Sequence, residues 1–162
     1  MILDTYTPFL NEIFKQLKEK GVDVSKFELD HLAYRTESKE VFDNLLPQIN
    51  ELGEQVHKNF ISGNIVCIFK LHEPLRYQNY SIPVIEFIGP NDSKNYPTGF
   101  EHAEFVIDED FEVFVNHYPG LKWDKSAIDR PEFPTLKLPL DENTQVKFHH
   151  ETVLDLAKFC NK

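Results

Sequence analysis

The first forty residues of the chain show a helical pattern of hydrophobic positions and then a strand-like one. Apolar side chains recur at spacings of three and four from Ile2 to Leu17. This spacing predicts an amphipathic helix over residues 2–20 that ends at Gly21. Residues 28–35 instead alternate between faces with a period of two, which predicts a strand.

A second helix and three strands are expected next. Ser38 is a candidate N-cap, and the apolar positions that follow it continue to Gly53. Pro47 lies inside this helix and should kink or restart it. Ser62 and Gly63 form a turn dipeptide, which predicts a hairpin around them. The strands are expected over residues 55–61, 64–71 and 82–88.

A segment rich in turn-forming residues, from Pro90 to Gly99, separates this part of the chain from a second part with the same order of elements. A strand, a short helix and three further strands are expected, over residues 100–107, 109–117, 121–128, 134–140 and 144–149. A closing helix should occupy residues 151–160. Each half is therefore expected to follow the order β-α-β-β-β.

A short sequence pattern occurs once in each half. Residues 28–35 (ELDHLAYR) and residues 99–106 (GFEHAEFV) each contain an acid and a histidine, followed by alternating small or polar and large apolar side chains. Later in each half, Ile85-Glu86-Phe87 has a counterpart in Val146-Lys147-Phe148. Such self-similarity predicts a duplicated β-rich module, with a site where the two copies meet.

Strand alternation predicts which polar side chains share a face. On the first strand His31 and Arg35 lie on one face, and on its counterpart His102 and Glu104 lie together, opposite Glu101. The duplication makes the two histidines comparable. We therefore expect the two imidazoles to approach each other where the halves meet.

The fourth strand of each half contributes further candidates. Glu86 lies in an otherwise apolar strand, and Lys147 and His149 share one face of the last strand. Two imidazoles and a carboxylate from different strands are the ligands of a divalent-metal site with open positions. The spacing alone is weak evidence, because no HxH or HExxH pattern supports it. The histidines could instead bond to strand carbonyls, and Glu86 could face solvent.

Composition narrows the classes of partner. The chain has 162 residues, 41% of them hydrophobic and 13% aromatic, so it can bury a sizeable core. Its formal charge of −10 argues against nucleic acid and anionic membranes as general partners. Residues 1–20 are too polar for a signal peptide or a membrane span. Cys67 and Cys160 are expected to be reduced thiols, which favours a cytoplasmic protein.

Several segments, spread in order over nearly the whole chain, resemble the YecM family of the vicinal-oxygen-chelate superfamily, which also includes glyoxalase, bleomycin resistance and dihydroxybiphenyl dioxygenase proteins. They are Asp30-His31, Ile61-Ser62-Gly63, Cys67-Ile68-Phe69-Lys70-Leu71-His72-Glu73-Pro74, Ile85-Glu86, Tyr96-Pro97, Glu101-His102-Ala103-Glu104, Pro134-Thr135-Leu136 and Val146-Lys147-Phe148-His149. The run FKLHEP is the most specific of them.

The resemblance implies an α+β fold in which two βαβββ modules, residues 25–90 and 99–150, form a curled mixed sheet around a cleft. The helices over residues 2–20 and 151–160 are additions to a single domain that spans residues 1–162. Because both modules lie in one chain, a monomer is sufficient to form the cleft. A homodimer is the alternative.

The resemblance also implies that His31, Glu86 and His102 bind a divalent metal ion, with zinc, nickel, manganese and iron all open. Lys147 occupies the usual place of a fourth ligand, and a protonated lysine cannot bind a metal. His149 could replace it only after a local shift. A site with three ligands and a site with three histidines and one glutamate are both left open.

Other polar side chains are candidates for contact with substrate. Arg35 suits a carboxylate or phosphate group, and Lys70 and His72 are further candidates for substrate binding. Glu104 and His149 could move a proton in a reaction. The alternatives are a structural ion pair between Arg35 and Glu104, and a solvated His72.

Two functions follow from these residues. The first is a metal-dependent enzyme, an isomerase, lyase or dioxygenase, that chelates vicinal oxygens of a small substrate. The second is a small-molecule binding module without turnover, which Lys147 at a ligand position favours. A cleft filled by phenylalanine side chains would instead indicate a structural role.

Overall fold

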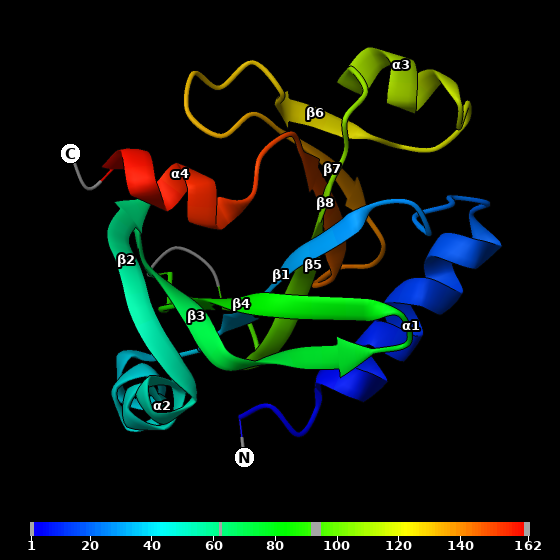
Figure 1. Ribbon diagram of the computed structural model, residues 1–162. Helices are drawn as coiled ribbons and strands as arrows, with labels where there is room; N and C mark the ends of the chain where they lie inside the picture. The colour runs from blue at the N-terminus through cyan, green and yellow to red at the C-terminus, as the bar shows by residue number, and fades with distance from the viewer. Residues whose placement is uncertain (1, 62, 92–94, 161–162) are drawn as a thin grey trace.

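The computed structural model describes residues 2–61, 63–91 and 95–160, which form eight strands and four helices (Figure 1). The helices are α1 (Tyr6–Glu19), α2 (Lys39–Leu52), α3 (Phe111–Asn116) and α4 (Val153–Cys160). The strands are β1 (Glu28–Arg35), β2 (Gly53–Ile61), β3 (Asn64–Tyr77), β4 (Tyr80–Ile88), β5 (Gly99–Val106), β6 (Asp124–Ala127), β7 (Thr135–Pro139) and β8 (Gln145–His149).

All eight strands belong to one mixed sheet in the order β2-β3-β4-β1-β5-β8-β7-β6. The two halves of the chain meet where β1 pairs with β5 in antiparallel orientation. On either side, β1 runs parallel to β4, and β5 runs parallel to β8. Each half therefore has the same β-α-β-β-β order around a central junction. The α+β fold with a curled, open sheet is confirmed.

The outer face of the sheet carries the main hydrophobic core. Apolar side chains of β1, β4, β5 and β8 pack there against α1, α2 and α3, and many of them are aromatic. The largest side chains with almost no exposed surface are phenylalanines, at positions 69, 87, 105, 114 and 148. Burial of each such side chain stabilises the fold by about 1.5–3 kcal/mol, so this face contributes much of the stability of the fold.

The inner face is different in character. Its hydrophobic cluster is small, and it brings Ala33, Val66 and Ile88 of the first half together with Val153 of α4. His31, His102 and His149 are also buried here, each with 1% of its surface exposed. Figure 1 shows α4 lying beside β2, on the side of the sheet opposite α1 and α2. The inner face thus combines buried polar groups with a helical cover.

Helix α2 runs without interruption through Pro47, where the sequence predicts a kink or restart. The predicted N-cap is present, because the Ser38 hydroxyl accepts a hydrogen bond from the backbone N–H of Val41. Phe42 and Ile49 are buried on its inner side, whereas Pro47 is exposed. Packing of the apolar stripe therefore outweighs the missing backbone donor.

Strand β3 is longer than the sequence predicts. Expected to end at Leu71, it continues to Tyr77, and β4 already begins at Tyr80. The pairing between the two strands shifts register between Lys70 and Leu75, which accommodates Pro74 within the strand. The other predicted elements are present with shifted ends. The predicted turn residue Ser62 lies outside the described residues.

Two further expectations concern the environment of the protein. None of the described helices is long and apolar enough to cross a membrane. Cys67 is buried as a free thiol. The side chain of Cys160 lies outside the described part of the chain.

Candidate metal centre

Two β-bulges lie where β1 pairs with β5. Leu29 pairs with Phe105 and His31 with Glu104, so Asp30 is an extra residue on β1. In the same ladder Ala33 pairs with His102 and Tyr34 with Phe100, so Glu101 is an extra residue on β5. A bulge breaks the alternation of side chains between faces. The expectation that Glu101 lies opposite His102 is therefore wrong, because Glu101 turns toward the His102 ring.

Each bulge places a carboxylate against the neighbouring imidazole. The Nδ1 atom of His31 lies 2.8 Å from Oδ2 of Asp30. The Nδ1 atom of His102 lies 3.3 Å from Oε1 of Glu101. When Nδ1 donates to a carboxylate, Nε2 of the same ring remains available to a metal ion. In both histidines it is Nε2 that points into the inner face.

Four ligand atoms converge between the two bulges. They belong to His31, Glu86, His102 and Glu104, here called the ligand set, and all lie within 4.8 Å of one another. Oε2 of Glu86 is 3.0 Å from Nε2 of His102 and 3.9 Å from Nε2 of His31. Ligands at about 2.0–2.2 Å from one ion lie about 3–3.5 Å apart. The set is thus close to the spacing that a single ion requires.

Glu104 is the fourth member of the set, a position that the sequence analysis did not assign to it. Its Oε1 atom lies 3.1 Å from Nε2 of His102 and 3.5 Å from Nε2 of His31. The register explains the placement, because Glu104 is directly opposite His31 on the neighbouring strand. The sequence contains a signal for this placement. The second residue after the histidine is Ala33 in the first half but the acidic Glu104 in the second.

A buried polar atom without a partner supports a ligand-binding role. Within the described part of the chain, no hydrogen-bond partner is found for Nε2 of His31. Burial of a polar atom without a partner costs about 1–3 kcal/mol. An ion bound by imidazole nitrogen and carboxylate oxygen would use the His31 nitrogen. The residues present therefore fit a divalent metal.

Lys147 reaches the same group of atoms. Its Nζ atom lies 3.1 Å from Oε1 of Glu104 and 3.0 Å from Nε2 of His102. The side chain is 18% exposed, and that of Glu86 is 16% exposed, whereas the other three members of the ligand set are almost fully buried. The side of this group that is partly open to solvent is therefore that of Glu86 and Lys147.

His149 lies behind the ligand set. Its Nε2 atom is 3.4 Å from Oε2 of Glu104 and 3.6 Å from Oδ2 of Asp30. The Phe133 ring covers it, with the ring centroids 4.6 Å apart. Burial lowers the pKa of His149, so the imidazole is neutral at pH 7. His149 thus contacts Glu104 from the interior and is shielded from the opening.

The charged side chains of the inner face do not balance one another unless the histidines are protonated or a cation is bound. The carboxylates belong to Asp30, Glu86, Glu101 and Glu104. Arg35 and Lys147 supply two permanent positive charges, which leaves a formal charge of about −2 when the histidines are neutral. Two imidazolium ions or one divalent cation would balance it.

The metal-free protein balances these charges with protons. Burial alone would lower the pKa of His31, but Glu104 and Asp30 hold it well above its usual range. Burial and Lys147 act to lower the pKa of His102, and its bonds to three carboxylates raise it to about 9. Both rings are therefore charged at neutral pH without metal.

The candidates for substrate binding lie in different places. Arg35 pairs with Glu101, not with Glu104, and also donates to the Asn64 side chain at 3.2 Å. Its guanidinium lies over the Tyr96 ring, 4.5 Å from the centroid. Lys70 and His72 are exposed on β3, and among the described residues no ion pair joins either to the ligand set.

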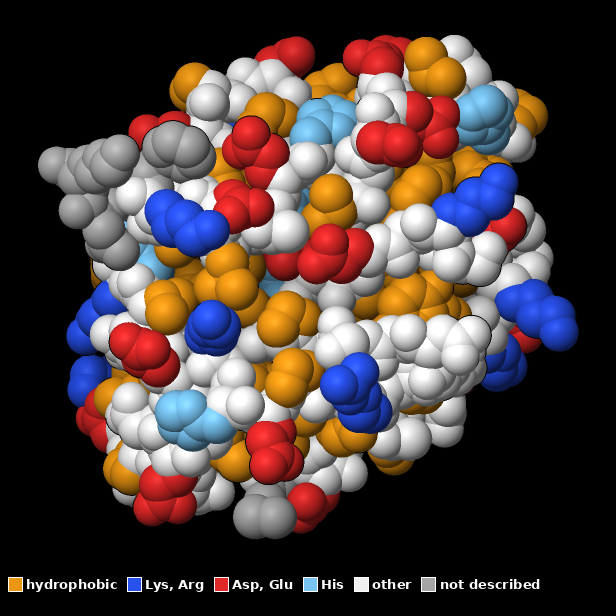
Figure 2. Space-filling model, in the orientation of Figure 1, with side chains coloured by type: hydrophobic (Ala, Val, Ile, Leu, Met, Phe, Trp, Pro, Cys, Tyr) orange, Lys and Arg blue, Asp and Glu red, His pale blue; other side chains and the backbone are white. Residues whose placement is uncertain are grey.

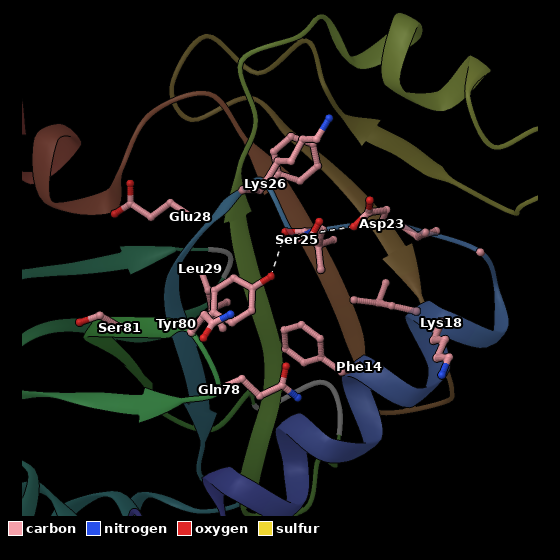
Figure 3. Close-up of a pocket in the computed structure, with 16 residues that line it drawn as sticks. Phe14, Lys18, Asp23, Ser25, Lys26, Glu28, Leu29, Gln78, Tyr80 and Ser81 are labelled. Carbon is pink, nitrogen blue, oxygen red and sulfur yellow. Dashed lines mark hydrogen bonds between the residues drawn. The ribbon is translucent and has the colours of Figure 1, made fainter.

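A large pocket lies away from the ligand set. A cavity of about 910 Å³ lies between the end of α1, the loop that follows it and the β3–β4 turn (Figure 3). Two hydrogen bonds lie within it, from the Tyr80 hydroxyl to the Val24 carbonyl and from the Ser25 backbone N–H to the Asp23 carboxylate. On the face of the molecule shown in Figure 2, basic, acidic and hydrophobic side chains are interspersed.

Comparison with known proteins identifies the family. The sequence profile of the YecM protein family matches residues 1–159. The chain belongs to this family. Protein YecM of Escherichia coli (strain K12) is 26% identical over 165 residues, which cover 92% of this chain and 87% of the relative.

Solved structures show the same fold. A structural genomics target named Protein EC4020 matches with a TM-score of 0.83 at 24% identity, over 98% of this chain and 90% of that one. Methylmalonyl-CoA epimerase, in complex with methylmalonyl-CoA and NH4+, matches with a TM-score of 0.53 at 10% identity, over 78% of this chain and 96% of that one. At these identities the likeness concerns the fold alone.

Proposed function

We propose that the protein binds one divalent cation through His31, Glu86, His102 and Glu104 and presents it to a small, oxygen-rich substrate. The observation that carries this proposal is the convergence of two imidazole nitrogens and two carboxylate oxygens within 4.8 Å, on a buried face between the two halves. The charge balance supports one ion, because one dication replaces two protons. Zinc, nickel, manganese and iron all accept this mixture of ligands.

The opening beside Glu86 and Lys147 defines how a substrate would approach. A bound ion would act as a Lewis acid toward adjacent substrate oxygens. The Lys147 ammonium lies next to this position and is partly exposed, so it can swing toward an anionic group of the substrate. Arg35, which the sequence analysis proposed for this task, is held by Glu101 and Tyr96.

The roles in proton transfer remain predictions. Glu104 has one oxygen in the ligand set and the other near His149, at 3.4 Å from its Nε2 atom. His149 is 1% exposed, and Glu104 lies between it and the rest of the ligand set, so a proton that it exchanges with the site would pass through Glu104. This arrangement supports Glu104 rather than His149 as the group nearest to a substrate.

The second candidate function is a binding module that works without turnover. Lys147 favours it, because its ammonium already neutralises Glu104 where a metal ion would otherwise do so. In that case the inner face would bind an anionic small molecule through Lys147 and the protonated histidines. No ion would then be needed.

Metal analysis separates the two functions. Protein purified without chelator should contain close to one equivalent of a transition metal, and apoprotein should take up Co²⁺ or Zn²⁺ with the release of about two protons, measured by calorimetry in two buffers. His31→Ala and His102→Ala should each weaken Co²⁺ binding by at least about 100-fold, since each removes one ligand.

His117→Ala is the matched control, because His117 pairs with Glu109 on the surface, away from the ligand set. It should bind Co²⁺ as the unmodified protein does. If neither His31→Ala nor His102→Ala lowers bound metal relative to this control, the metal-binding function is rejected and the binding module is favoured.

A further inference from the structure

The acids that precede the two ligand histidines occupy equivalent places in the two halves. Asp30 comes directly before His31 and Glu101 directly before His102, and each is the extra residue of a bulge in the β1–β5 ladder. Two bulges at matching positions are a specific feature of this backbone. In a regular strand both carboxylates would point to the opposite face, into the aromatic core.

The bulges instead give each imidazole a carboxylate on its Nδ1 side. The separations are 2.8 Å for Asp30 and His31 and 3.3 Å for Glu101 and His102. A bulge leaves one residue out of the ladder and so sacrifices backbone hydrogen bonding. The same arrangement on both histidines indicates that this loss serves the orientation of the rings.

We propose that Asp30 and Glu101 are positioning residues that hold His31 and His102 in the Nδ1–H tautomer, with the Nε2 lone pair directed at the ion. The inference rests on the proposed metal-binding function and adds to it the residues that orient two ligands. Carboxylates bonded to the far nitrogen of a metal-binding histidine fix its ring and increase its basicity.

Both carboxylates are themselves anchored from outside the ligand set. Oδ2 of Asp30 accepts a hydrogen bond of 3.0 Å from the backbone N–H of Val153, the first residue of α4. Glu101 is anchored by Arg35, which lies over Tyr96. The orientation of His31 is thus tied to the docking of α4, and that of His102 to the segment between the two halves.

The two positioning residues are not equal in strength. The bond from Asp30 is shorter, and Asp30 is 1% exposed, whereas Glu101 is 12% exposed and shares its carboxylate with Arg35. A hydrogen bond is stronger where water is excluded. Substitution of Asp30 should therefore weaken metal binding more than substitution of Glu101.

Isosteric substitutions test this inference. Asp30→Asn and Glu101→Gln keep the shape and an acceptor oxygen but remove the charge, and we expect Co²⁺ affinity of the apoprotein to fall by about 10–100-fold, more for Asp30→Asn. Glu109→Gln is the matched control, because Glu109 bonds His117 at 2.8 Å on the surface. It should leave Co²⁺ affinity unchanged.

A spectroscopic readout separates positioning from a loss of folding. Long-range ¹H–¹⁵N correlation spectra of the unmodified protein loaded with Zn²⁺ should show His31 and His102 protonated on Nδ1 and bound through Nε2. Thermal unfolding with chelator should show whether each variant folds. Rings protonated on Nε2, or affinities of both folded variants within twofold of the control, would overturn the proposal.

The same measurements distinguish failure of the positioning role from failure of the proposed metal-binding function. If the unmodified protein takes up no Co²⁺, the metal-binding function fails and the positioning role with it. If Co²⁺ is lost in His31→Ala but retained at full affinity in Asp30→Asn and Glu101→Gln, only the positioning role fails.

Discussion

At the scale of single residues, the two halves differ at the position of Glu86 and its counterpart. Glu86 on β4 and Lys147 on β8 occupy corresponding positions, since each lies two residues after the partner of His31 or His102 in a parallel ladder. The second half supplies its carboxylate from Glu104 instead, where the first half has Ala33. The carboxylate of the second half thus lies on β5 and not on β8, and a lysine occupies the position on β8 that corresponds to Glu86.

Lys147→Glu tests this exchange of charge. The substitution removes the cation that neutralises Glu104 and adds a carboxylate next to it, so the apoprotein should lose on the order of 3 kcal/mol of unfolding free energy. Metal affinity should rise, because the new carboxylate is close to the ion. The gap between melting temperatures with chelator and with Zn²⁺ should widen.

The control for this substitution is Lys125→Glu, which breaks an exposed pair with Glu112. It should change both melting temperatures little, since exposed ion pairs contribute about 0–1 kcal/mol. An unchanged gap in Lys147→Glu would show that Lys147 does not compete with the ion.

At the scale of elements, local sequence rules are overridden where packing is strong. Helix α2 carries Pro47 in its interior, and its buried positions Phe42 and Ile49 keep it continuous. Strand β3 passes Pro74 by a shift in register. The bulges in β1 and β5 change which face a side chain takes, and no local pattern announces them.

Pro47→Ala should stabilise the protein. Proline in a helix interior is about 3 kcal/mol less favourable than alanine, and Pro47 is exposed, so the substitution disturbs no core contact. We expect the free energy of unfolding to rise by about 1–3 kcal/mol, measured by urea denaturation. Gln48→Ala, at the neighbouring exposed position, should change it by less than about 0.5 kcal/mol. A loss of stability in Pro47→Ala would mean that the proline ring makes a necessary contact.

At the scale of the whole molecule, folding brings together charges that the chain keeps far apart. The two halves contribute histidines and carboxylates to one buried group, and protons on the histidines, or a bound ion, would balance its charge. Stability without metal must therefore depend on pH.

The sign of this dependence follows from His102. Its pKa is raised to about 9 in the folded metal-free protein from an ordinary value of 6.5. Its stabilising contribution is thus fully present below pH 6.5 and is lost as the pH rises through about 9. The melting temperature of protein in chelator should fall over this range.

His102→Gln provides the comparison, because it removes the titrating ring and keeps a polar side chain. This variant should lack the part of the decline that His102 contributes, whereas the part from His31, whose pKa is also raised, should remain. An equal decline in both proteins would assign the pH dependence to other groups.

Much of the architecture follows from periodicity. Alternation at residues 28–35 and the helical spacing from Ile2 to Leu17 predict the right elements, because burial of one apolar face drives both. The repeated acid–histidine pattern predicts the shared order of the two halves. The family resemblance then names His31, Glu86 and His102 as residues of one site, and the structure brings them together.

The sequence by itself determined the elements, their order and the three residues expected to meet, because these depend on local periodicity and on similarity between the halves. Only the tertiary structure decided that Asp30 and Glu101 turn toward their histidines, that Arg35 pairs with Glu101 and that Glu104 joins the ligand set. Those outcomes depend on the register between β1 and β5, and a shift of one residue in register changes the face of a side chain. Such a shift depends on how the two strands pack together, so it cannot be predicted from the sequence of either strand alone.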